Sequence, residues 1–153
     1  GDGADSLYGG TEYDTLWGGA GPDQVWGGPG RDTVLLGLGD DAFFDGKQKG
    51  PHGHDRVWGG IGNDTLRAGG GNDTLTGGPG ADHFVFAAPG GWHRVTDFTP
   101  GEDVLRIEKP GLRYADLTIE TVAGDARIDY GAGHIRLDDV APQDLDPGDF
   151  LFV

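Results

Sequence analysis

The chain contains no cysteine and no methionine among its 153 residues, and Ser6 is its single serine. Without cysteine there is no disulfide framework and no thiolate nucleophile. Lys and Arg number 11 against 26 Asp and Glu, so the formal net charge is −15 and the basic surface that nucleic-acid binding requires is missing. No apolar run approaches the roughly 20 residues of a transmembrane helix. We therefore expect no nucleic-acid partner and no transmembrane segment.

Residues that usually carry catalysis are scarce as well. Neither G-x-S-x-G nor H-E-x-x-H occurs. Carboxylates are so numerous that pairs of them indicate nothing about acid–base chemistry. His83, His93 and His134 are scattered and are interpreted as surface or strand residues. We expect no catalytic residues and no enzyme activity in this chain.

Glycine and aspartate are abundant instead. Glycine accounts for 32 residues, and the acids divide into 22 Asp and 4 Glu. A helical surface favours Glu, whereas Asp is typical of turns and of metal sites with oxygen ligands. This bias indicates a turn-rich protein with sites for a hard cation.

Nine aspartates recur at a fixed interval in the first half of the chain. Every step is nine residues except one of fourteen, which contains an insertion at about 45–52. An apolar residue stands two positions after each aspartate, and glycines precede each aspartate. Together they give the pattern G-G-x-G-x-D-x-U-x, in which U is apolar. A flexible acidic linker would not keep an apolar residue in phase nine times.

Each repeat is interpreted as a glycine turn followed by a strand of three residues. Glycine permits positive φ and close backbone approach in the turn. The single apolar residue faces inward and its two neighbours face outward. Two repeats form one coil, and stacked coils form parallel sheets. The predicted fold is all-β, a right-handed parallel β-roll of nonapeptide repeats with an antiparallel β C-terminal cap.

Stacking places each aspartate over the one two repeats later. One edge of the roll then carries Asp5, Asp23, Asp41, Asp64 and Asp82, and the other carries Asp14, Asp32, Asp55 and Asp73. Two carboxylates about 5 Å apart repel by roughly 0.8 kcal/mol even in water, so a cation must bridge them. Ca²⁺ accepts about six to eight oxygen ligands in flexible geometry, whereas Mg²⁺ demands an octahedron and keeps its waters.

The repeat resembles the calcium-binding repeats-in-toxin (RTX) family over residues 1–85. The resemblance implies carbonyl ligands from motif positions two and four of one turn and one and three of the next. The expected set is Gly1, Gly3, Gly10, Gly18, Gly19, Gly21, Gly27, Gly37, Gly39, Gly59, Gly60, Gly62, Gly70, Gly77 and Pro79. Glu12, Leu36 and Ala68 replace turn glycines, and the insertion interrupts the Asp32/Asp55 site most. About five to seven Ca²⁺ ions are expected.

Glycine becomes sparse in the second half, with 24 in residues 1–82 and 8 in residues 83–153. Alternating apolar segments take over, and the turn residues at 123–125 and 131–133 indicate antiparallel hairpins. We predict an RTX β-roll over 1–85 and a capping β region over 86–153. Asp97 and Asp103 either hold one more ion or cap turns.

The chain from residue 80 to 107 resembles the segment that closes serralysin-type secreted proteins. Asp149 followed by the apolar residues 150–153 resembles the uncleaved type I secretion signal of that group, and is also compatible with a last edge strand. The resemblance implies a calcium-binding C-terminal module of a secreted, extracellular bacterial protein. Its expected partners are an upstream domain of the parent protein and the type I secretion apparatus.

A second interpretation is a binding module for alginate or another polysaccharide, similar to the R-modules of mannuronan C-5 epimerases. The aromatic residues that follow the buried positions are expected to point outward, either to shield the thin roll or to form a docking or glycan surface. The charge of −15 argues against a polyanionic ligand unless the arginines gather on one face.

Overall fold

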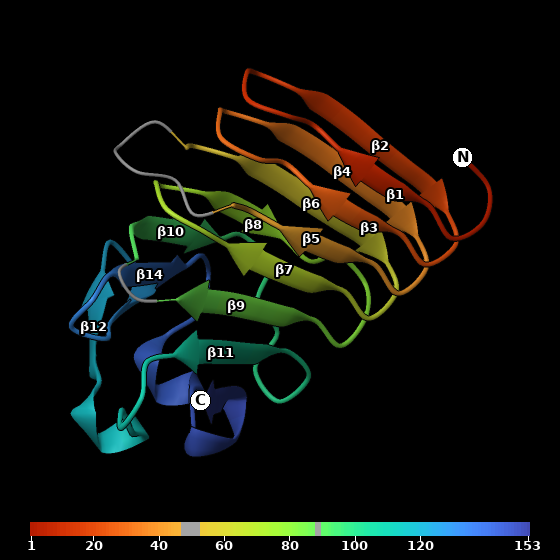
Figure 1. Cartoon of the computed structure of the whole chain (residues 1–153). Coiled ribbons are helices and arrows are strands. Elements are labelled where there is room, and N and C mark those ends of the chain that lie inside the picture. Colours follow the sequence, from red (N-terminus) through yellow and green to blue (C-terminus); the bar gives the residue numbers. More distant parts are fainter. Residues whose placement is uncertain (47–52, 88–89) are drawn as a thin grey trace.

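The computed structural model describes residues 1–46, 53–87 and 90–153, and its regular structure is almost entirely β (Figure 1). Most of the predicted insertion, residues 47–52, lies outside the described residues. A seven-stranded sheet forms one layer, and all of its neighbouring strands are parallel. Its order is β1 (Ser6–Tyr8), β3 (Gln24–Trp26), β5 (Ala42–Phe44), β7 (Thr65–Ala68), β9 (His83–Ala87), β11 (Val104–Glu108) and β15 (Phe150–Phe152).

An eight-stranded sheet forms the other layer. Its order is β12 (Thr118–Val122), β13 (Asp125–Asp129), β14 (His134–Leu137), β10 (Trp92–Val95), β8 (Thr74–Thr76), β6 (Arg56–Ile61), β4 (Thr33–Leu38) and β2 (Thr15–Ala20). In the part of the chain that the structure describes, helix is limited to the single 3₁₀ turns η1 (Tyr114–Asp116), η2 (Pro142–Asp144) and η3 (Pro147–Asp149). Within the three described ranges, no helix has the length and apolar content needed to cross a bilayer.

The in-phase apolar residues fill the space between the two sheets. Seven of the nine are fully buried, namely Val25, Val34, Phe43, Val57, Leu66, Leu75 and Phe84. Leu7 and Leu16 are half-buried because β1 and β2 each have a sheet neighbour on one side only. Most strands of the roll contribute one buried side chain, and β4 and β7 contribute a second, Leu36 and Ala68, so the core between the sheets is thin.

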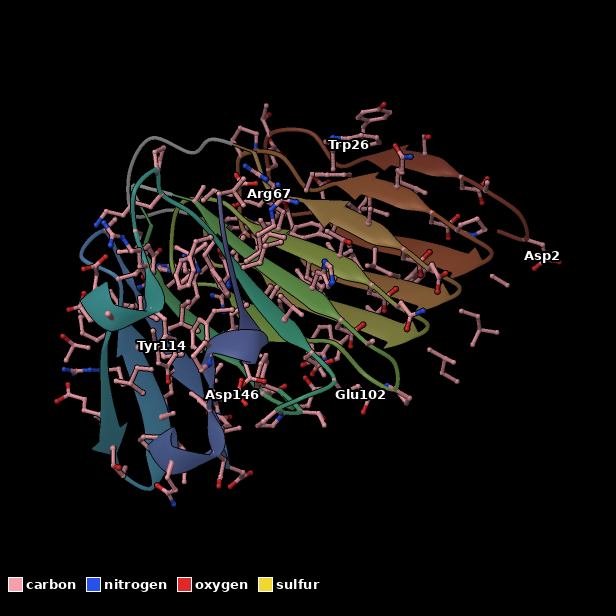
Figure 2. All side chains as sticks on the ribbon, turned by 90° about the horizontal axis from the view of Figure 1, so that it is seen from below. Asp2, Trp26, Arg67, Glu102, Tyr114 and Asp146 are labelled. Carbon is pink, nitrogen blue, oxygen red and sulfur yellow. The ribbon has the colours of Figure 1, made fainter. Side chains whose placement is uncertain are left out.

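The residues that follow the buried positions point outward, as expected. Trp17 and Trp58 are exposed on the eight-stranded sheet. On the other sheet Tyr8, Trp26 and Phe44 stack with ring centroids 4.6 and 5.3 Å apart (Trp26 is labelled in Figure 2). The stack leaves Trp26 and Phe44 only partly exposed, so these rings cover one another on the outer face of the roll.

The two sheets differ in strand length, which corrects one expectation. In the seven-stranded sheet β1, β3 and β5 have the predicted three residues, but β2, β4 and β6 have six. The longer strands continue into the turn, where Gly19 pairs with Gly37 and Gly37 with Gly60. Their positive φ values of 120°, 125° and 117° let the chain curve while its hydrogen bonds continue.

The second half of the chain extends both sheets and then covers one end. Strands β11 and β15 continue the seven-stranded sheet, and β10 and β14 continue the other in parallel register. The two predicted hairpins are confirmed, because β12 pairs with β13 and β13 with β14 in antiparallel fashion. The all-β fold, with a parallel β-roll and an antiparallel β cap, is thus confirmed (Figure 1).

Replacing Gly60 by Ala should destabilise the roll far more than replacing Gly101 by Ala. Both glycines have positive φ, so both variants carry backbone strain. A Cβ at Gly60 would also collide with the carbonyl oxygen of Gly37 in the next coil, whereas a Cβ at Gly101 meets nothing. We expect Gly60→Ala to lower the unfolding free energy by at least about 2 kcal/mol more, measured by denaturation in saturating Ca²⁺. Equal losses would mean that the coils can separate at little cost.

Candidate metal centre

The repeat aspartates directly precede the strands, so their carboxylates line the two edges of the roll. Along the first edge, the backbone N–H of each aspartate donates to Oδ1 of the aspartate in the next coil. The N···Oδ1 distances are 2.8 Å for Asp5 to Asp23, 2.7 Å for Asp23 to Asp41, 2.9 Å for Asp41 to Asp64 and 2.8 Å for Asp64 to Asp82. The structure thus brings these aspartates together in the predicted order.

The second edge follows the same rule. The N···Oδ1 distances are 3.0 Å for Asp14 to Asp32, 2.8 Å for Asp32 to Asp55 and 2.9 Å for Asp55 to Asp73. The Asp32/Asp55 pair therefore keeps its register across the insertion. The coil that should follow Asp73 has a histidine in place of an aspartate.

His93 ends the second row, and the sequence interpretation missed this role. Its side chain is buried, with Nδ1 3.2 Å from Oδ2 of Asp73 and 3.5 Å from the Asp73 backbone N–H. Phe86 packs against the imidazole at 5.2 Å between ring centroids. The available signal was spacing, since His93 follows Asp73 by 20 residues, close to the 18 of one coil.

In Asp97 and in Asp103, each of the two carboxylate oxygens accepts a hydrogen bond. Asp97 accepts from the N–H groups of Gly77 and Gly78, at 2.9 and 2.8 Å. Asp103 accepts from Asp82 at 2.9 Å and from Thr99 at 2.8 Å. Of the two expectations for this pair, the hydrogen bonds favour turn capping. Asp103 also extends the first row by one coil.

Eight of the nine repeat aspartates, all except Asp5, have one oxygen without a hydrogen-bond partner among the described residues. These are the Oδ2 atoms of Asp14, Asp23, Asp32, Asp41, Asp55, Asp64, Asp73 and Asp82, all of them buried. All of these residues except Asp14 are at most 2% exposed. A buried, ionised oxygen without a partner is strongly unfavourable, so each of these atoms calls for a cation or a proton.

Burial shifts the protonation of these carboxyl groups in the metal-free protein. It is the main cause that raises the pKa of Asp55 from 3.8 to about 8, that of Asp64 to about 6 and that of Asp82 to about 7. Repulsion between stacked carboxylates adds to each shift. The row therefore holds negative charge near neutral pH only at a cost, and a divalent cation removes that cost.

The turns supply backbone oxygens next to the carboxylates. A Cβ at Gly59 would collide with Oδ2 of Asp64 and lie 2.5 Å from the carbonyl oxygen of Gly77, so only glycine leaves this space open. For eleven of the expected carbonyl ligands, the carbonyl oxygen lies so close to a glycine of the adjoining coil that a Cβ on that glycine would collide with it. These ligands are Gly1, Gly3, Gly10, Gly19, Gly21, Gly27, Gly37, Gly39, Gly60, Gly62 and Gly77.

The other four expected carbonyl ligands are placed differently. The carbonyl oxygens of Gly18 and Pro79 accept hydrogen bonds from the N–H groups of Gly1 and Gly62, the latter at 3.1 Å. Gly59 lies against the Asp64 carboxylate, and Gly70 lies in the turn that precedes Asp73. Carboxylates and carbonyls without nitrogen or sulfur donors fit Ca²⁺. Ligation by each of these residues stays a prediction.

Asp5 differs from the other row members. Its side chain is 42% exposed, and Oδ2 lies 3.2 Å from the backbone nitrogen of Gly1. Asp45, which the sequence analysis did not include, lies buried beside the second row. Its sequence signal was an aspartate where other turns have their first glycine.

Comparison with known proteins identifies the repeat. The sequence matches the family described as the RTX calcium-binding nonapeptide repeat (4 copies) over residues 1–34, 14–43 and 53–84. No curated protein of matching sequence was found.

Solved structures similar to the chain include a lipase and two epimerase subunits, and the two subunits, with TM-scores above 0.5, share its fold. The chain is similar to the extracellular lipase LipA from Serratia marcescens, with 16% identity and a TM-score of 0.47, over 100% of this chain and 39% of the lipase. It is also similar to the AlgE6R3 and AlgE6R2 subunits of the Azotobacter vinelandii mannuronan C5-epimerase. Identity is 23% and 21%, and the TM-scores are 0.53 and 0.52. The matches cover 98% and 95% of this chain, and 78% and 91% of the subunits.

In chelator, acid should partly replace the cation. A carboxyl group whose pKa is raised by folding stabilises the fold below its unfolded value of 3.8, and this contribution is lost as pH rises through about 6 to 8. We expect the β signal in circular dichroism to grow as pH falls from about 8 to about 4. Asp64→Asn, which mimics the neutral group, should raise the signal at neutral pH, while the exposed Asp144→Asn should not. A β signal that falls or stays constant on acidification would contradict this origin of the instability.

Proposed function

Because this chain belongs to the family of proteins with RTX calcium-binding nonapeptide repeats, we propose that it is the calcium-folded C-terminal module of a secreted bacterial protein. The eight buried aspartate oxygens without hydrogen-bond partners carry the proposal. Ca²⁺ binding to the rows would neutralise them and join coil to coil. The module is proposed to have no catalytic activity of its own, so that the parent protein's activity resides elsewhere.

Calcium supplies enough free energy to make folding conditional. Extracellular calcium modules bind with dissociation constants of about 10⁻⁴–10⁻³ M. At ten times that concentration each site contributes about 1.4 kcal/mol, and seven sites contribute about 10 kcal/mol, comparable with the stability of a whole domain. The chain would stay unfolded where Ca²⁺ is scarce, in the cytosol, and fold outside the cell.

The type I secretion signal is proposed to be the C-terminal segment. Residues 150–152 form β15, which pairs with β11 at the end of the seven-stranded sheet. Asp149 accepts hydrogen bonds from Gly101 at 2.8 Å and Asp146 at 2.7 Å. An exporter would read this tail in the unfolded chain, and the tail would become an edge strand afterwards. Secretion and the upstream partner are supported by the resemblance alone.

Calcium-coupled folding tests the proposal directly. In chelator at neutral pH, circular dichroism should show little β structure, and Ca²⁺ should restore it in a cooperative transition. Mg²⁺ at the same concentration should do much less, because it demands octahedral geometry and keeps its waters. The same β signal with and without chelator at neutral pH would refute a calcium-folded module.

A specific surface supports a second function, polysaccharide binding. A hollow of about 370 Å³ is lined by Trp92, Asp129, His134 and neighbouring glycines. Trp92 is 57% exposed, its ring lies 4.0 Å from that of His134, and the guanidinium of Arg127 lies 5.9 Å from it. An exposed aromatic ring flanked by polar groups is a suitable platform for a sugar ring.

A polyanionic ligand would need arginines gathered on one face, because the net charge is −15, and several arginines do lie together. Arg127, Arg136 and Arg94 lie side by side across β13, β14 and β10. Arg56 lies in the same row, beyond Thr74 of β8. Half of the chain's eight arginines thus share the outer face of this sheet. Three of them already pair with acids, as in the contacts of Arg94 with Asp138, Arg136 with Asp125 and Arg127 with Glu120.

Glycan titration of the calcium-loaded chain separates the two functions. Under the second function, alginate or a neutral polysaccharide should bind, and Trp92→Ala should weaken binding by about tenfold. Tyr13→Ala, which removes another highly exposed ring far from the hollow in sequence, should leave binding unchanged. Equal binding by the two variants, or no binding by the unmodified chain, would leave the folding module as the sole function.

A further inference from the structure

The break in the repeat brings a third carboxylate to one aspartate pair. Asp45 directly follows β5 and stands where the turns before Asp32 and Asp64 have Gly27 and Gly59. Its backbone N–H donates to the carbonyl of Arg67 at 3.0 Å, so the chain still follows the ladder at this point. The residue is only 7% exposed. A charged side chain has therefore entered the space between two coils.

The geometry of Asp45 is that of a third ligand. One carboxylate oxygen from each of Asp45, Asp55 and Asp73 lies within 4.8 Å of the other two. Oδ2 of Asp45 also accepts a hydrogen bond from the N–H of Gly69, at 3.2 Å. A Cβ at Gly69 would collide with this oxygen and lie 2.5 Å from the carbonyl oxygen of Gly46. The neighbouring coil thus leaves room for the extra carboxylate.

The other two members supply an independent sign of a ligand. Asp55 and Asp73 are 1% and 2% exposed, and neither Oδ2 atom has a hydrogen-bond partner in the described part of the chain. Nδ1 of His93 lies 3.2 Å from Oδ2 of Asp73 and is the one basic nitrogen beside this oxygen among the recorded ion pairs of the described residues. Two buried carboxylate oxygens without a hydrogen-bond partner, beside a third carboxylate, call for a cation.

We propose that Asp45, Asp55 and Asp73 form a three-carboxylate Ca²⁺ site that binds its ion more tightly than the two-carboxylate sites of the roll. The inference rests on the proposed function and deepens it. Ligand charge tunes calcium affinity in oxygen-ligand sites. A third negative charge near the ion adds attraction that the other gaps do not have.

The site lies across the insertion, so its higher affinity would affect how the coils assemble. The step from Asp32 to Asp55 is 23 residues, whereas the regular coil has 18. A longer connection costs more entropy to close and defines the register of the next coil less well. An ion bound here first would fix the coil on the far side of the insertion before the weaker sites fill.

Two substitutions of Asp45 in the full chain test the site. Asp45→Asn keeps the shape and the acceptor for Gly69 but removes the charge. Asp45→Gly restores the residue that the regular turns have. Asp144→Asn removes one charge at an exposed position of the cap and is the matched control. Calorimetric titration with Ca²⁺ counts the sites by affinity, and circular dichroism in saturating Ca²⁺ verifies that each variant folds.

The unmodified chain should show one site at least about tenfold tighter than the rest. Both Asp45 variants should lose this tight site while keeping the weaker ones, and Asp144→Asn should retain it. In crystals exposed to substoichiometric Tb³⁺, the first anomalous peak should lie among Asp45, Asp55 and Asp73. Unchanged affinities in the folded Asp45 variants, or a first peak elsewhere, would overturn the three-carboxylate site and leave the calcium-folded module intact. An unmodified chain that binds no Ca²⁺ would overturn both.

Discussion

Each internal coil buries aspartates in which one carboxylate oxygen is hydrogen-bonded and the other is not. Oδ1 accepts the backbone N–H of the preceding coil, at 2.8 Å between Asp64 and Asp82, and this bond sets the stacking distance. Oδ2 is buried with no such partner. The same side chain therefore joins coils through one atom and opposes their approach through the other. Stacking is favourable when a cation satisfies the second oxygen.

Glycine in the turns follows from this requirement. The space beside Oδ2 of Asp64 is occupied by backbone of its own turn at Gly59 and of the next coil at Gly77, so a side chain there would exclude both the ion and the neighbouring coil. The turn residues thus serve the metal site and the stacking together. Only small, backbone-lined turns can bring several carbonyl oxygens and two carboxylates around one ion.

The apolar core of the roll is thin and supplies little stabilisation against the repulsion between stacked carboxylates. Most strands of the roll bury one apolar side chain between the sheets, as β3 does with Val25 and β8 with Leu75, and β4 and β7 add Leu36 and Ala68 to theirs. The cap is built differently, because its buried residues Phe86, Ile107 and Ile135 come from strands with two or more inward positions. The end of the roll that lies against the cap is therefore held by hydrophobic contact, while the far end depends more on ions.

The amino-acid sequence was enough to predict the fold and the two aspartate rows, because a strict period of nine with one apolar residue allows a single way to stack coils. It also located the hairpins at 123–125 and 131–133 through their turn residues. It did not reveal that β2, β4 and β6 extend to six residues, since glycine is a weak strand former whose pairing depends on the adjoining coil.

Where the period fails, the arrangement of residues depends on how the folded chain packs. His93 ends the second row, Asp103 extends the first, and Asp45 approaches Asp55 and Asp73. His93 and Asp103 follow their row neighbours by 20 and 21 residues instead of 18, and Asp45 occupies a glycine position of the turn, so the strict period of aspartates does not place them. Their positions follow from how the insertion and the cap pack against the last regular coils, and such packing is a property of the folded chain rather than of its local pattern.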